Sequence, residues 1–305
     1  MPTTSHTAPL TPDQAEALRT LLDQLGFEFK EKPYTLFAAS KDKLSIAVYE
    51  KGPKVLIQGK ATEDFIINHL EPEILGEAKL GYEEVHHPDW FSPHFGIDES
   101  GKGDFFGPLV TAGVYTDEAI TRTLMDLGVT DSKRITSDKR ITDLAEQIEG
   151  IPGIAVDVVQ INPLKYNDLY ESFLNLNKLL AWAHARCIAN LAAKKPNCPR
   201  TLSDQFGNPR LIEHALSKHD IPPLELQQRT KAESDPAVAA ASIIARHRFI
   251  TALKTLAQEA GLESPLPRGA GPKTQEFMRD LAHSHGKNAL RPLAKMHFKF
   301  TETVL

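Results

Sequence analysis

Apolar residues near the N-terminus recur first at helical spacing and then at strand spacing. Residues 11–25 begin with a Thr-Pro pair, and four leucines of this segment fall on one side of a helix with 3.6 residues per turn. Three short β-prone runs follow at 34–39, 44–49 and 54–58, and a helical pattern covers 61–70. This order predicts a small antiparallel sheet with helices on one face.

The pattern changes twice after residue 70. Residues 71–94 are acidic, contain prolines and show only weak periodicity, which is typical of a linker. From residue 95 onwards, strand and helix patterns alternate, and the long ones lie at 95–100, 109–116, 154–160, 175–193, 200–204, 211–217 and 235–260. We therefore expect an N-terminal domain at 1–70, a linker at 71–94 and an α/β domain at 95–305, whose mixed sheet is layered by helices.

Composition places few limits on this picture. The chain has 305 residues, 41% of them hydrophobic and 25% charged, without an apolar run long enough to cross a bilayer. Its start lacks the basic and apolar regions of a signal peptide, and its two cysteines indicate neither a disulfide framework nor a zinc site. We expect a cytoplasmic protein without membrane contact, and a monomer because no extended apolar surface pattern requires a partner.

One segment carries the clearest chemical signal. Asp98 and Glu99 end a short apolar run, and Gly101, Lys102 and Gly103 follow almost directly. Paired carboxylates hold a hard cation such as Mg²⁺ or Mn²⁺, and a glycine-rich backbone can point N–H groups at an anion. A nucleotide-binding P-loop is excluded, because that motif needs a hydroxyl directly after the lysine and carries no carboxylates inside its phosphate cradle. The segment indicates phosphodiester chemistry.

Two further acids stand at the ends of apolar elements. Asp204 closes the strand pattern at 200–204, and Asp235 precedes Pro236 at the start of the long helix, where it is suited to be an N-cap. Taken singly, the first is typical of a turn and the second of a cap without chemistry. Four acids that each end an apolar element indicate more, because a pair of divalent ions needs several carboxylates on one side of a sheet.

These motifs, in this order, strongly resemble the type 2 ribonuclease H family. The resemblance rests on four parts of the sequence, namely 98–108, 131–133, Asp204 and 231–246. Within the family it is greatest for the ribonuclease HIII branch, because Lys102 stands where relatives of the HII kind usually have arginine, Asp-Phe-Phe follows Gly103, and an extra N-terminal domain is present.

The resemblance implies an activity and a site. It implies a ribonuclease H-like fold that hydrolyses the RNA strand of RNA–DNA hybrids by two-metal-ion catalysis and leaves 5′-phosphate and 3′-hydroxyl ends. Mg²⁺ and Mn²⁺ both favour octahedral oxygen sites, so either is expected. The implied metal and catalytic residues are Asp98, Glu99, Asp204 and Asp235, with Asp98 shared between the ions. Substrate contacts are expected from Gly101, Lys102 and Gly103, and also from Lys133 and Lys231.

The resemblance also implies a role for residues 1–70. That segment matches the family's TATA-binding-protein-like domain, which grips the hybrid across a sheet face. Residues 1–90 carry a net charge of −6, which opposes phosphate binding unless basic side chains gather on one face. The candidates are Lys41, Lys43, Lys51, Lys54 and Lys60.

Two other functions fit parts of the pattern. A nucleic-acid-binding module without activity would use the Gly-Lys-Gly turn and the basic C-terminal stretch, but it would leave the acids beside a phosphate backbone unexplained. Another nuclease of the ribonuclease H fold, such as a resolvase acting on DNA junctions, would use the same acids. A requirement for the ribose 2′-hydroxyl would separate the two nucleases.

Overall fold

The computed structural model describes residues 4–76 and 83–303, and the chain divides into two compact units. The first unit is Met1–Asp89 and the second is Trp90–Leu305. Each has a five-stranded sheet of its own and its own hydrophobic core. The two sheets differ in kind, since the first is entirely antiparallel and the second is mixed.

The N-terminal unit is a sheet with the strand order β1-β5-β4-β3-β2. Its elements are β1 (Ser5–Pro9), α1 (Pro12–Gln24), β2 (Glu28–Lys30), β3 (Thr35–Lys41), β4 (Leu44–Tyr49), β5 (Lys54–Gly59), α2 (Thr62–Phe65) and the π-helical η1 (Ile66–Leu75). Leu18 and Leu22 of α1, together with Ile66 and Leu70 of η1, are fully buried in one core with the sheet. The predicted helix and three central strands are present, whereas the two edge strands β1 and β2 were not predicted.

The segment expected to be a linker contains ordered structure at both ends. The helical pattern continues through η1 to Leu75, because Leu70 and Ile74 lie one turn apart and both reach the N-terminal core. Beyond residues 77–82, which lie outside the described part of the chain, are α3 (Glu83–His86) and the 3₁₀ helix η2 (Pro88–Phe91). The linker expected at 71–94 therefore starts too early, and His94 already belongs to the first strand of the second sheet.

The C-terminal unit has the strand order β10-β9-β6-β7-β8. Its strands are β6 (His94–Ser100), β7 (Leu109–Thr116), β8 (Ala155–Ile161), β9 (Arg200–Asp204) and β10 (Glu225–Arg229). Its helices are α4 (Glu118–Asp126), η3 (Ser132–Arg134), α5 (Asp138–Glu149), α6 (Pro163–Phe173), α7 (Leu176–Lys194), α8 (Arg210–Leu216), η4 (Ala232–Ser234), α9 (Pro236–Glu259), α10 (Pro272–His285), η5 (Lys287–Leu290) and η6 (Lys299–Thr303). The expected mixed sheet layered by helices is confirmed.

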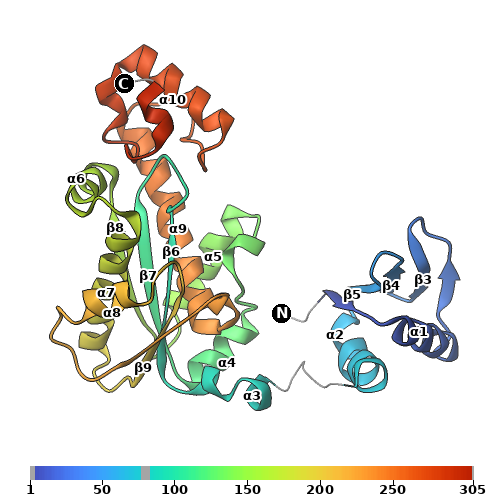
Figure 1. Ribbon diagram of the computed structural model, residues 1–305. Helices are drawn as coiled ribbons and strands as arrows, with labels where there is room; N and C mark the ends of the chain where they lie inside the picture. The colour runs from blue at the N-terminus through green and yellow to red at the C-terminus, as the bar shows by residue number, and fades with distance from the viewer. Residues whose placement is uncertain (1–3, 77–82, 304–305) are drawn as a thin grey trace. The chain divides into compact units, whose positions relative to one another are not determined.

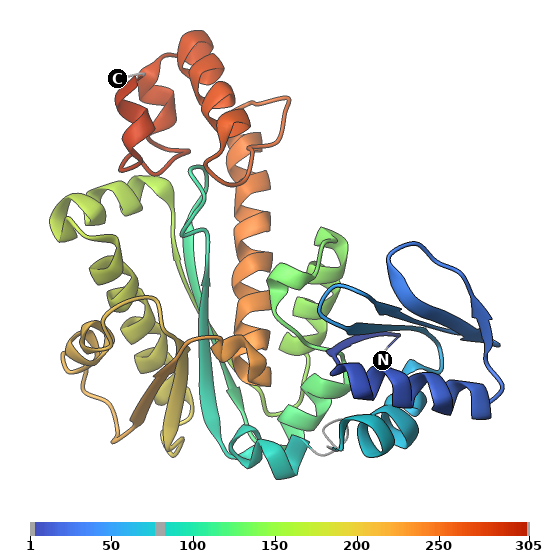
Figure 2. The same ribbon diagram turned by 45° about the vertical axis from the view of Figure 1, so that its right-hand side comes forward.

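Helices cover both faces of this sheet. Helices α4, α5 and α9 share a core with Val110, Ala112 and Val114 of β7, whereas α7 and α8 pack with Phe95 and Ile97 of β6. The orange α9 runs alongside the teal strands β6 and β7 in both views (Figures 1 and 2). Among the described residues, no helix is long and apolar enough to span a bilayer.

A glycine allows α9 to lie directly against the central strand. A Cβ atom at Gly96 of β6 would come within 2.3 Å of the backbone of Ala237 and Val238, closer than any side chain permits. The first turns of α9 are rich in alanine, so the helix backbone and the strand backbone approach each other closely. This contact fixes the N-terminus of α9 beside the strand that ends in Asp98 and Glu99.

Candidate active site

Two aspartates of the C-terminal unit lie near the carboxyl ends of neighbouring parallel strands. The pairing of β6 with β9 runs from Phe95 with Thr201 to Ile97 with Ser203, so Asp98 and Asp204 follow as the next residues of the two strands. Parallel strands lie about 4.8 Å apart, and their carboxyl ends meet at the same edge of a sheet. The sheet thus brings together two of the acids singled out in the sequence.

A tight turn joins β6 to β7 next to these acids. Gly101 has a φ of +88°, and a Cβ atom there would lie 2.2 Å from the carbonyl oxygen of Pro108, so this position requires glycine. A Cβ atom at Gly103 would meet nothing within 4 Å, so the missing side chain leaves open space over the turn. Asp104 closes the turn, because its Oδ1 accepts a 2.6 Å hydrogen bond from the N–H of Gly269.

A fully buried lysine holds the far side of this turn. The Nζ of Lys295 donates to the carbonyl oxygens of Phe106, Gly107 and Pro108 at 3.4, 2.6 and 3.3 Å. Burial lowers the pKa of Lys295 to about 7, although the charge of Asp104 favours the ammonium form. Lys295 was not identified from the sequence, since only the folded chain brings it to the turn.

The acids and the turn line one cavity of about 500 Å³. Asp98, Glu99, Asp104 and Asp204 contribute carboxylates, and the whole of Gly101–Gly103 forms part of the wall. Lys133 lines it as well, as do three residues that the sequence did not single out, namely Phe206, Arg246 and Arg268. The cavity is therefore acidic at its centre and basic at its margin.

Burial and mutual repulsion oppose ionisation of the two aspartates. Burial raises the pKa of Asp98 well above its usual range, and the charge of Glu99 raises it further, although the N–H of Glu99 and the charge of Lys133 act in the opposite direction. Burial likewise raises the pKa of Asp204, opposed by a hydrogen bond from the N–H of Ala232. A cation between these carboxylates would relieve both effects.

Glu99 has partners that keep it ionised. Burial opposes its charge, but a hydrogen bond from His184 and the charges of His184 and Lys102 lower its pKa. His184 Nε2 lies 3.2 Å from Oε2 of Glu99, and its Nδ1 lies 3.0 Å from the hydroxyl of Ser203. The Nζ of Lys102 is 3.5 Å from Oε1 of Glu99 and 5.1 Å from the ring centroid of Phe206. His184 is a further residue that sequence reasoning missed.

Lys133 faces the same carboxylates from the other side of the cavity. Burial lowers its pKa, but the charges of Asp98, Asp131, Glu233 and Asp204 outweigh this effect and raise it. Its helical turn η3 is held against α9, because the N–H of Ser132 donates to the Ser242 hydroxyl at 3.1 Å and the Arg246 guanidinium donates to the Ser132 carbonyl. Lys133 thus lies in the cavity near the acids, and the substrate contact expected of it stays a prediction.

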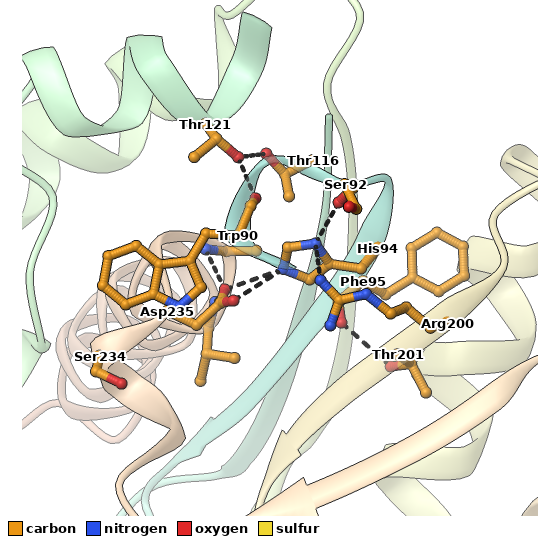
Figure 3. A network of polar contacts seen from close by, with 12 residues as sticks. Trp90, Ser92, His94, Phe95, Thr116, Thr121, Arg200, Thr201, Ser234 and Asp235 are labelled. Atoms are coloured by element: carbon orange, nitrogen blue, oxygen red, sulfur yellow. Dashed lines mark hydrogen bonds and ion pairs between the residues drawn. The ribbon is translucent and has the colours of Figure 1, made fainter. Parts of the chain in front are cut away.

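Asp235 lies apart from the other three predicted acids. It is fully buried at the N-terminus of α9, where its Oδ1 accepts from the N–H groups of Ala237 and Val238 at 2.9 and 3.3 Å. His94 Nε2 lies 3.1 Å from both of its oxygens, and Figure 3 shows the two side chains facing each other. Asp235 does not line the cavity. The cap is confirmed, but the structure does not bring this carboxylate into the site.

Glu233 is the acid of this segment whose charge reaches the others, although it does not itself line the cavity. It lies on η4, is partly exposed, and its charge acts on both Asp204 and Lys133. Its signal in the sequence is an acid directly after Lys-Ala, two positions before the cap, but the sequence alone favours Asp235 because Asp235 starts the long helix. Lys231 precedes it in a left-handed conformation with φ of +59°, and its exposed side chain does not line the cavity.

Comparison with known proteins identifies the family of this chain. The family model described as Ribonuclease HII matches residues 95–301. Two curated proteins named Ribonuclease HIII, from Protochlamydia amoebophila (strain UWE25) and Chlamydia muridarum (strain MoPn / Nigg), are 43% and 38% identical. These alignments cover 95% and 99% of this chain, and 93% and 97% of the relatives. The crystal structure of Bst-RNase HIII in complex with Mn²⁺ superposes with a TM-score of 0.67 at 28% identity, covering 99% of this chain and 98% of that one.

The chain belongs to the ribonuclease HIII branch of the type 2 ribonuclease H family. The resemblance inferred from the motifs is thus confirmed over nearly the whole chain. A ribonuclease HIII is a ribonuclease of the H type, a hydrolase, so the binding module without activity is no longer a candidate.

The donor set of this ribonuclease HIII suits a hard divalent cation. The cavity offers carboxylate oxygens of Asp98, Glu99 and Asp204, with Glu233 beside them, and neither cysteine nor exposed histidine contributes to its wall. Oxygen-only ligands favour Mg²⁺ and Mn²⁺ over zinc. Within the described residues, no three acidic, histidine or cysteine side chains already stand close enough together to hold an ion.

Proposed function

We propose that this chain hydrolyses the RNA strand of RNA–DNA hybrids, using two divalent metal ions and leaving 5′-phosphate and 3′-hydroxyl ends. One observation carries the proposal: Asp98 and Asp204 lie next to each other on adjacent parallel strands, in a cavity that also contains Glu99 and the open Gly101–Gly103 turn. Bound divalent ions of this kind supply an activated water and neutralise charge that develops on the phosphate. The crystal structure of Bst-RNase HIII in complex with Mn²⁺ supports the choice of metal.

The side chains divide this work by their surroundings. Asp98 is the buried acid at the centre, so it is our candidate for the carboxylate shared between two ions. His184 keeps Glu99 ionised and fixes the direction of its Oε2. Lys133 and Lys102 offset negative charge that a phosphate would bring to the cavity.

We further propose Glu233, and not Asp235, as the fourth carboxylate. Glu233 is partly exposed and its charge reaches Asp204 and Lys133, so it can turn towards an ion held there. Both oxygens of Asp235 are engaged by His94 and by the start of α9, and moving them would expose unpaired buried donors. Asp235 is the less favourable ligand for this reason.

The Gly101–Gly103 turn supports the choice of substrate. A hybrid presents 2′-hydroxyls in a wide, shallow minor groove, where a backbone can approach only if side chains are absent. Gly103 leaves such a space, and the phenyl ring of Phe206 holds Lys102 beside it. Lys231 is a weaker candidate for a phosphate contact, because its exposed side chain does not line the cavity.

We propose a substrate-gripping role for the N-terminal unit as well. Three of its candidate lysines, Lys41, Lys43 and Lys60, line one hollow of about 430 Å³ at the end of the sheet where β3 turns into β4. Lys51 and Lys54 lie at the opposite end, at the turn between β4 and β5. The basic side chains therefore form one group of three, despite the acidic charge of the unit.

Cleavage of a labelled hybrid tests the proposal. Wild type and Asp98→Asn are incubated with an RNA–DNA hybrid and with the matching all-DNA duplex, in Mg²⁺, in Mn²⁺ and in chelator. Cleavage confined to the RNA strand, dependent on metal and lost in the variant, is the expected result. Cleavage of the all-DNA duplex would favour the DNA-junction nuclease, and full activity in Asp98→Asn would refute the metal site.

A further inference from the structure

A second hollow of the C-terminal unit lies on helices α6, α7 and α8, outside the cavity of the carboxylates. Its volume is about 480 Å³, within the range of sites that hold a nucleotide-sized ligand. The side chains that matter for its chemistry are Phe173, Lys178, Trp182, His214, Lys218 and His219. None of the residues that line it is acidic.

The charge of this hollow is opposite to that of the chain as a whole. The full chain of 305 residues has a net formal charge of −5. Lys178 and Lys218 of the hollow are exposed, and no ion pair with a described residue engages either of them. Asp168 and Glu171 of α6 are both paired with Arg291 at 3.0 Å. Glu213 and Asp220 are exposed next to His214 and His219 in the sequence, but neither lines the hollow. An anion is therefore the complementary ligand.

The hollow also has an aromatic wall. Trp182 and Phe173 lie against each other with ring centroids 6.5 Å apart and planes at 49°, and both line the hollow. Aromatic rings next to lysines are the combination on which unpaired nucleobases stack while their phosphates meet positive charge. An acidic peptide would use the lysines but would leave the aromatic wall without a matching partner.

Phe206 connects this hollow with the catalytic cavity. Its ring lines the cavity below Lys102, and it packs in the same hydrophobic cluster as Phe173 and Trp182. The next residue, Gly207, lies against Asn177 of α7, since a Cβ atom there would be 3.1 Å from the Asn177 amide nitrogen. Phe206 of the cavity wall and the two aromatic residues of the hollow thus belong to one packed cluster.

We propose that this hollow binds a single-stranded nucleotide of the substrate, where one strand extends beyond the paired hybrid. Trp182 provides the stacking surface, and Lys178 and Lys218 contact the adjoining phosphates. The inference rests on the proposed function and deepens it, because it assigns a preference among hybrids: those with an unpaired extension bind more tightly than blunt ones.

Binding affinities of blunt and extended hybrids test the inference. The full chain carrying Asp98→Asn is titrated into a fluorescent hybrid that is blunt or bears a short oligothymidine extension at one strand end, each end in turn. Stacking of one base contributes about 1–3 kcal/mol, so an extension at the correct end should lower Kd about 5- to 100-fold. The gain should disappear in Trp182→Ala and in the pair Lys178→Gln with Lys218→Gln, while Kd for the blunt hybrid stays unchanged.

Matched controls separate local binding from charge and folding. Lys194→Gln with Lys195→Gln removes the same charge at the other end of α7, about 24 Å away along a helix that rises 1.5 Å per residue, and should retain the gain. Oligothymidine alone should quench tryptophan fluorescence in the wild type and not in Trp182→Phe, which keeps the packing against Phe173. This measurement does not depend on whether the alanine variant folds.

The failure of this inference differs from the failure of the proposed function. Equal affinity for blunt and extended hybrids would overturn the inference, and cleavage of the blunt hybrid by wild type would leave the function standing. A gain that persists in both hollow variants would also overturn it. A wild type that cleaves no hybrid would refute the proposed function. If the extended hybrid nevertheless binds more tightly than the blunt one, and this difference in Kd disappears in the hollow variants, the hollow would still be supported as a site for single strands.

Discussion

The acids Asp98 and Asp204, which line the cavity, and Asp235, which does not, differ in their surroundings. Asp98 and Asp204 stand beside other carboxylates, with one backbone N–H bond each, and their pKa values are raised. Asp235 is at least as buried, yet two backbone N–H groups and an imidazole satisfy it. Asp98 and Asp204 lack enough donors to offset the cost of their burial, so a bound cation would stabilise their ionised forms. The hydrogen bonds of Asp235 all come from the protein.

The comparison separates acids that serve the reaction from acids that serve the fold. A carboxylate whose donors all come from the protein stabilises the elements that supply them, here the start of α9 and strand β6. A carboxylate with too few donors costs stability until a ligand completes it.

Replacement of Glu233 should have the largest effect on activity. Glu233→Gln keeps the size of the side chain but removes a charge that faces Asp204, and loss of about 3–4 kcal/mol of transition-state stabilisation corresponds to roughly 10²–10³-fold in kcat/KM. The melting temperature should stay near that of the wild type. Single-turnover cleavage of a hybrid measures the first quantity, and Glu259→Gln, an exposed acid outside the cavity, is the control. An unchanged rate in Glu233→Gln would favour Asp235 as the fourth metal-binding carboxylate.

Replacement of Asp235 should act mainly on stability. Asp235→Ala removes the cap of α9 and leaves the His94 ring and two N–H groups unsatisfied, which costs roughly 2–4 kcal/mol of unfolding free energy. Asp117→Ala removes a partly exposed cap of α4 with a single N–H bond and should cost only about 1 kcal/mol. Urea unfolding measures both. A variant as stable as wild type but without activity would mean that Asp235 is a ligand after all.

The same two acids define how far the sequence could predict the site. The cap at Asp235 was predictable because Pro236 and an alanine-rich helix follow it directly. Its pairing with His94, 141 positions earlier, was not, since it depends on α9 lying against β6. Glu233 lies in the same motif, but only the folded chain shows that its charge acts on Asp204.

The fold was predicted best where long apolar patterns repeat. Helices α7 and α9 and strands β6, β7 and β9 agree with the predicted ranges within a few residues. Strand β10 has the polar sequence Glu-Leu-Gln-Gln-Arg and lies at the sheet edge with one neighbour, so it shows no alternation. Helix α5 was not predicted, although its apolar residues recur at helical spacing behind a Ser137 cap.

Loss of His184 should move the pH dependence of activity. His184 lowers the pKa of Glu99, so Glu99 stays ionised down to a lower pH than it would alone. In His184→Gln the pKa of Glu99 rises, and the acidic limb of the kcat/KM profile should shift to higher pH. Outer partners of a ligand contribute about 10- to 100-fold, so a loss of that size is expected near neutral pH. A uniform loss with an unshifted acidic limb would contradict this role.

Lys295 is a buried basic group to which the same question applies, namely whether protein groups alone stabilise its charged form. It is as buried as Asp235 and has three acceptors, yet burial lowers its pKa to about 7, from 10.5 in the unfolded chain. Between these values the unfolded chain binds the proton and the folded chain does not, so unfolding free energy should rise with pH by about 1.4 kcal/mol per unit. Lys295→Met keeps the packing and removes the titration, so its stability relative to wild type should fall from pH 7 to pH 10.

The turn itself provides the second readout for Lys295. If the three carbonyl contacts position Gly101–Gly103, Lys295→Met should raise KM for the hybrid more than it lowers kcat, because the carboxylates keep their own partners. Lys299→Met, on an exposed lysine of η6, is the control and should change neither. A difference in stability between Lys295→Met and wild type that does not vary with pH would mean that the three acceptors hold the ammonium form throughout. Lys295 would then belong with Asp235, as a buried charge that the fold alone satisfies.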